Sequence, residues 1–194
     1  KVIGIDFTPI MIQKARSNAE KLGFNNVEFR EGDIDAMPVN DAVADVIVSN
    51  CVLNLVPNKE KVISEIHRVL KPGGHFSISD IVLVGDLPEA LKQDAEMYAG
   101  CVAGAIQKGD YLKLIEDRGF QNINIQKEKT ISIPDDILSK YLSQDEIQSF
   151  NKGATGIYSI TVYAEKEGVR QEKPKLKLSE IQASDCCEPT SGCC

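Results

Sequence analysis

The sequence predicts an α/β fold built around a doubly wound, mostly parallel β-sheet. Short apolar runs recur along the chain, and stretches with the apolar spacing of helices separate them. The first run, Val2-Ile3-Gly4-Ile5, is wholly apolar, which fits a strand buried on both faces. Near the C-terminus two strand-like stretches follow each other without a long helix between them. We therefore expect an antiparallel pair at one edge of the sheet.

The first half of the chain alternates strands and helices. After the strand at residues 2–6, Thr8 is the expected N-cap of a helix, Pro9 fits its first position and Gly23 ends it. Further strands are expected at residues 27–30, 45–49 and 75–79. A helix over residues 59–70 separates the last two strands and should stop at Lys71-Pro72-Gly73-Gly74.

The second half continues with two helical stretches and then the two edge strands. The helices are expected at about residues 88–99 and 109–118, and the strands at residues 122–133 and 157–164. From Glu165 onward the chain is charged and polar, which is typical of a flexible tail. The predicted organisation is one domain over residues 1–164 and a cysteine-containing tail over residues 165–194.

Composition narrows the classes of partner. The chain has 194 residues and a net charge of -7, which disfavours binding to nucleic acid or to an anionic membrane surface. No apolar run approaches the roughly 20 residues of a membrane span. The sequence opens on a strand rather than a signal peptide, and its cysteines are not spread like a disulfide framework. These features favour a reducing, cytoplasmic compartment.

The strand ends carry the candidate site, because parallel α/β sheets bind ligands beyond the carboxyl ends of their strands. The residues there are Asp6, Asp33, Asn50, Cys51 and Asp80. An acid such as Asp6 accepts hydrogen bonds from ribose hydroxyls in nucleotide folds, although an acid at a helix entry also has a purely structural use. The segment Gly32-Asp33-Ile34 offers an acid and an apolar side chain for an adenine ring.

Four segments together resemble the class I S-adenosylmethionine-dependent methyltransferases. They are VIGID, FREGDIDAMP, DVIVSN and HRVLKPGGHFSISD, and the resemblance covers about residues 1–164. It implies a Rossmann-like sheet and S-adenosylmethionine as cofactor. It also implies a set of cofactor-binding residues, namely Asp6, Phe7, Gly32, Asp33, Ile34 and Asn50.

Two further segments are similar to those of arsenite methyltransferases. They are SNCVLNL, which contains Cys51, and YAGCVAGA, which contains Cys101. The resemblance implies that both cysteines are catalytic and bind trivalent arsenic, a soft centre that prefers thiolates. It implies methyl transfer to thiol-bound arsenic, arsenic detoxification, and a small-molecule thiol as reductant. Because the arsenic lone pair is itself the nucleophile, no general base is required.

Two features of that family are not found in this sequence. The family's fold begins with a central strand and a glycine-rich turn, and its arsenic site takes a third cysteine from the same region. The central strand would lie between the strands predicted at residues 2–6 and 44–49. The chain therefore resembles the C-terminal part of an arsenite methyltransferase, and we expect it alone to bind cofactor weakly and to show no turnover.

Two other functions remain open from the sequence. One is a methyltransferase for a small organic acceptor, with Cys51 and Cys101 merely buried. The other is a non-catalytic fragment that binds soft metals. The tail contains four more cysteines, namely Cys186, Cys187, Cys193 and Cys194. They are either an accessory trap for arsenic or other soft metals, or exposed thiols without a function, and composition alone is compatible with both.

Overall fold

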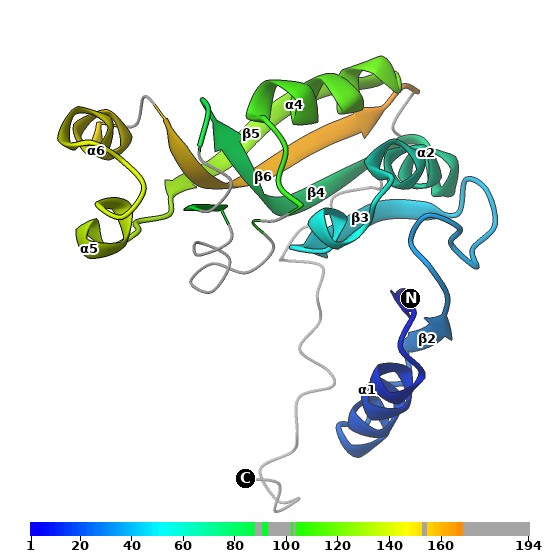
Figure 1. The fold of residues 1–194 in the computed structure, drawn as a ribbon. Coiled ribbons are helices and arrows are strands. Elements are labelled where there is room, and N and C mark those ends of the chain that lie inside the picture. The colour runs from blue at the N-terminus through cyan, green and yellow to red at the C-terminus, as the bar shows by residue number, and fades with distance from the viewer. Residues whose placement is uncertain (88–90, 93–101, 103, 153–154, 169–194) are drawn as a thin grey trace, which may run out of the picture.

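The computed structural model describes residues 1–87, 91–92, 102, 104–152 and 155–168. Within these residues the strands form two separate sheets (Figure 1). One sheet has two strands, and the other has four strands in the order β3-β4-β6-β5. In the part of the chain so described, no helix is long and apolar enough to span a membrane.

The two-stranded sheet belongs to an N-terminal unit of β1 (Val2–Asp6), α1 (Pro9–Lys21) and β2 (Val27–Glu31). β1 and β2 run parallel, as predicted. The helix starts at Pro9, but the side chain of Thr8 makes no capping hydrogen bond. Instead Asp6 Oδ1 accepts a hydrogen bond from the Thr8 N–H at 2.7 Å, so the acid at the strand end also fixes the helix entry.

The four-stranded sheet comprises β3 (Ala44–Asn50), β4 (Leu70–Val84), β5 (Phe120–Thr130) and β6 (Gly156–Lys166). β3 pairs with β4 in parallel, whereas β6 pairs antiparallel with both β4 and β5. This confirms the predicted antiparallel pair at the C-terminal edge, and β6 extends two residues into the predicted tail. Fully buried side chains of β4 and β6, such as Phe76 and Ile160, form the sheet side of the main core.

Two helices cover one face of this sheet. α2 (Lys59–Val69) and α4 (Lys108–Asp117) both contribute buried residues to that core, for example Ile63, Ile66 and Ile115. A short 3-10 turn, η1 (Leu53–Leu55), connects β3 toward α2. The predicted bounds of these helices agree with the structure within one residue. Most of the helix predicted over residues 88–99 lies outside the described residues.

The structure corrects the predicted elements in two places. Lys71-Pro72-Gly73-Gly74 is not a turn before a separate strand but a bulge inside β4, since Ala44 pairs with Leu70 and Val46 already pairs with His75. A Cβ on Gly74 would lie 2.9 Å from the Lys71 carbonyl oxygen, which explains a glycine in the bulge. Beyond β5, which ends at Thr130 rather than at residue 133, two short helices occur that were not predicted, α5 (Asp135–Leu138) and α6 (Gln144–Asn151).

β1 and β3 each have an edge that pairs with no other described strand. Apolar side chains beside these edges are open to solvent: Val2 is 56% exposed, Val46 48% and Val48 75%. Free edges with exposed valines are unusual for strands of a parallel sheet, which are normally covered. These edges belong to the two predicted strands between which the family places its central strand.

Candidate functional site

The first group of predicted site residues lies at the carboxyl ends of β1 and β2. The Gly32 N–H donates to the Asp6 carbonyl oxygen at 3.1 Å, which brings the two strand ends together. Asp33 is exposed, and its Oδ1 accepts a hydrogen bond from the Asp35 N–H at 3.4 Å. Phe7 is 70% exposed, whereas Ile34 packs against the main core. The structure therefore brings Asp6 to the turn that carries Asp33.

The second group lies at the carboxyl ends of β3 and β4. Asn50 is the exposed last residue of β3 and pairs with Ser79. Cys51 follows in a left-handed conformation with φ of 56°, which is uncommon for a residue with a side chain. Its N–H donates to the Ser79 carbonyl oxygen at 2.8 Å, so the paired strand holds this conformation. Cys51 is half-buried and packs against a second apolar cluster that includes Val102.

The segment after Cys101 lies directly against the segment after Cys51. A Cβ on Gly104 would be 1.8 Å from the Asn54 carbonyl oxygen, so only glycine allows this approach. The Ala105 N–H donates to the Val102 carbonyl oxygen at 2.9 Å and closes a turn. Cys101 itself and the four tail cysteines lie outside the described residues. Gly104 and Asn54, the two residues in contact, each lie three positions after a predicted arsenic ligand.

A buried polar pair joins β4 to α4. Asp80 is completely buried on β4, and its Oδ2 accepts a hydrogen bond from the Tyr111 hydroxyl at 2.8 Å. Burial raises the pKa of Asp80 to about 6, although the bond from Tyr111 and the charge of Lys59 act in the opposite direction. The sequence marked Asp80 only as a strand end. Its burial depends on α4 packing over β4, which the sequence does not reveal.

Asn54 is also buried, and its Nδ2 donates to the Ile81 carbonyl oxygen at 2.7 Å. This bond ties η1 to β4 one residue beyond Asp80. Sequence reasoning assigned Asn54 no role, and the only signal was its place in the SNCVLNL segment. Among the described residues, no three His, Cys, Asp or Glu side chains form a cluster that could hold a metal ion.

The predicted site residues thus form two groups on two sheets. Asp6, Gly32 and Asp33 lie on the N-terminal unit, whereas Asn50 and Cys51 lie on the four-stranded sheet. Both groups stand at the carboxyl ends of parallel strands, where α/β folds bind their ligands.

Comparison with known proteins assigns the fold to a class. A family model described as a methyltransferase domain matches residues 1–119, which is more than half of the chain. The chain belongs to this methyltransferase domain family.

Within that family the chain is similar to arsenite methyltransferases. It is 44% identical over 124 residues to one from Halobacterium salinarum, a match that covers 64% of this chain and 32% of the relative. It is 37% identical over 155 residues to one from Aquipseudomonas alcaligenes, covering 76% of this chain and 45% of the relative. The chain therefore spans less than half the length of these curated relatives.

Solved structures show the same likeness. The crystal structure of an arsenic(III) S-adenosylmethionine methyltransferase from Chlamydomonas reinhardtii matches with a TM-score of 0.67 and 30% identity. That match covers 86% of this chain and 56% of the other. The predicted Rossmann-like methyltransferase fold is confirmed.

Proposed function

We propose that this chain contributes to methyl transfer from S-adenosylmethionine to trivalent arsenic held by the thiolates of Cys51 and Cys101. The observation that carries the proposal is the close contact of Asn54, three residues after Cys51, with Gly104, three residues after Cys101. The similarity to arsenite methyltransferases at 37–44% identity supports the same substrate. Arsenic detoxification in the cytoplasm, with a small-molecule thiol as reductant, is the physiological setting that we propose.

The residues at the ends of β1 and β2 suit the nucleoside part of S-adenosylmethionine. The carboxylates of Asp6 and Asp33 can accept hydrogen bonds from ribose hydroxyls and an exocyclic amine, and Ile34 offers an apolar contact. Phe7, Gly32 and Asn50 complete the proposed set of cofactor-binding residues. The cofactor supplies the electrophilic methyl group, and the chain's task is to hold arsenic in line with it.

Titration with phenylarsine oxide, a trivalent arsenical that binds two thiols, tests the arsenic site. In a chain whose four tail cysteines are serine, we expect one equivalent to bind tightly. Cys51→Ser and Cys101→Ser should each weaken binding about a hundredfold, because a single thiol loses the effective concentration of its partner. Isothermal titration calorimetry measures the affinity.

The tail cysteines provide the control for this experiment. Restoring them should leave the affinity and the effects of both substitutions unchanged. Tight binding that requires the tail, and not Cys51, would instead support a soft-metal-binding fragment. If neither cysteine binds the arsenical and both are labelled slowly by thiol reagents, an organic methyl acceptor would be favoured.

We also propose that the chain by itself binds S-adenosylmethionine only weakly. The proposed nucleoside group and thiol group lie on separate sheets, and among the described residues no strand pairs with both β1 and β3 to join these sheets. Calorimetry with S-adenosylmethionine should therefore show no saturation at micromolar concentrations. A micromolar dissociation constant would contradict this expectation.

A further inference from the structure

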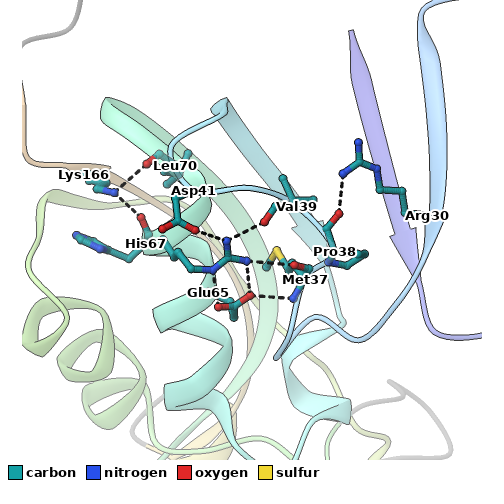
Figure 2. Close-up of polar contacts among 10 residues, drawn as sticks. Arg30, Met37, Pro38, Val39, Asp41, Glu65, His67, Leu70 and Lys166 are labelled. Carbon is teal, nitrogen blue, oxygen red and sulfur yellow. Dashed lines mark hydrogen bonds and ion pairs between the residues drawn. The ribbon is translucent and has the colours of Figure 1, made fainter.

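The loop between β2 and β3 is held mainly through its backbone (Figure 2). Arg68 on α2 donates to the carbonyl oxygens of Met37 at 3.1 Å and Val39 at 2.7 Å. Arg30 on β2 donates to the Pro38 carbonyl oxygen at 2.6 Å. Three consecutive carbonyl oxygens are therefore bound by two guanidinium groups, one from β2 of the N-terminal unit and one from α2, which packs on the four-stranded sheet.

Glu65 braces Arg68 from the same helix, and the side chains of Arg30, Arg68 and Glu65 together are called the arginine clamp. The Glu65 carboxylate accepts two hydrogen bonds from Arg68, both at 2.7 Å, and a third from the Met37 N–H at 2.8 Å. The bond from Arg68 lowers the pKa of Glu65 and keeps it ionised. The Glu65 and Arg68 side chains are only 17% and 29% exposed, so the pair is better shielded than an ordinary surface ion pair.

The clamp is linked to the turn that carries Asp33. A Cβ on Gly32 would lie 2.7 Å from Cδ of Pro38, so the start of the loop lies against its middle. Between them the Ala36 N–H donates to the Asp33 carbonyl oxygen at 3.2 Å. The position of Pro38 is therefore coupled to that of Gly32 by direct packing, and through Gly32 to Asp33, the next residue in the chain.

We infer that Arg68 and Glu65 are positioning residues, which hold the Asp33 turn at a fixed place relative to the four-stranded sheet and Cys51. The inference rests on the proposed role of Asp6 and Asp33 in nucleoside binding. The planar guanidinium of Arg68 reaches Glu65, Asp41 and the loop carbonyls at the same time. A lysine ammonium at this position has no such fork and cannot make the same set of bonds.

Adenosine, the part of the cofactor assigned to this turn, is the probe for the test. Its binding to the chain is followed by nuclear magnetic resonance, through the amide shifts of Gly32 and Ile34. Arg68→Lys should weaken adenosine binding about tenfold, which corresponds to roughly 1.4 kcal/mol. Glu65→Gln, which keeps an oxygen for Met37 but loses the charge, should act in the same direction. Arg118→Ala removes an exposed arginine after α4 and should have no effect.

A purely structural role is separated by measuring phenylarsine oxide binding in the same variants. If Arg68 positions the turn, arsenical binding at Cys51 stays as in the unaltered chain while adenosine binding falls. Equal loss of both, or unchanged adenosine affinity in Arg68→Lys and Glu65→Gln, would overturn the inference. Failure of the unaltered chain to bind adenosine would instead refute the proposed nucleoside site.

Discussion

Replacing Gly104 with alanine is expected to abolish tight binding of phenylarsine oxide. The added methyl group would lie 1.8 Å from the Asn54 carbonyl oxygen, and backbone atoms cannot rotate away as a side chain can. The segment after Cys101 must therefore move away from η1, which separates the two thiols. Affinity should fall about a hundredfold as the bridging complex is lost. Overpacking should also lower the free energy of unfolding by about 1–3 kcal/mol.

Gly109→Ala is the matched control for this prediction. Gly109 lies in the first turn of α4, five residues further along, and beyond the adjoining helix backbone no atom lies within 4 Å of the position of an added Cβ. Alanine there should leave arsenical binding unchanged and stabilise the helix by about 0.5–1 kcal/mol. If Gly104→Ala binds phenylarsine oxide as tightly as the unaltered chain does, the contact with Asn54 does not set the spacing of the thiols.

The sequence predicted the elements whose signals are local. Short strand-like stretches located β1, β2, β3, β6 and the middle of β4, and Pro9 marked the start of α1. The bulge in β4 was missed because Pro72, Gly73 and Gly74 normally end an element, and only pairing with β3 shows that the strand continues. α6 carries a capping box between Ser143 and Glu146, a sequence signal that was present but not used.

Sequence reasoning proposed site residues only where the residue type and its place at a strand end suggest a chemistry. Cys51 and Asp6 stand out because a thiol and an acid follow strand ends, although each also has a structural use there, and Asp6 does fix the entry of α1. Arg68 was visible only as one letter of the HRVLKPGG segment. Its role depends on contacts with residues about thirty positions away, Met37 and Val39, which no local pattern encodes.

The ionisation of Asp80 should control how stability depends on pH. Because the pKa of Asp80 is raised from 3.8 to about 6, the folded chain binds a proton more tightly than the unfolded chain between these values. The contribution of Asp80 to stability therefore falls as pH rises through this window and is constant above it. About two pKa units correspond to roughly 3 kcal/mol.

Asp80→Asn isolates this effect, because asparagine is uncharged at every pH and still accepts the hydrogen bond from Tyr111. Relative to the unaltered chain, the variant should gain about 2 kcal/mol of unfolding free energy between about pH 4 and about pH 7, because part of the full difference already develops below pH 4. Urea denaturation at both pH values measures the difference, and comparison within each pH cancels the other titrating groups.

Tyr111→Phe should show the opposite dependence on pH. It removes the hydrogen bond at 2.8 Å that favours the ionised form of Asp80, so its destabilising effect is greatest where that form dominates. Hydrogen bonds to charged groups contribute about 1.5–3 kcal/mol, and the loss at neutral pH should fall in that range. At about pH 4 the bond joins two neutral groups, and the loss should be roughly half as large.

Plots of stability against pH for the two variants decide whether Asp80 titrates in this window. If both run parallel to the plot for the unaltered chain, Asp80 does not titrate there. Curves that diverge in opposite directions would identify Asp80 and Tyr111 as the pair that makes the packing of α4 on β4 sensitive to pH.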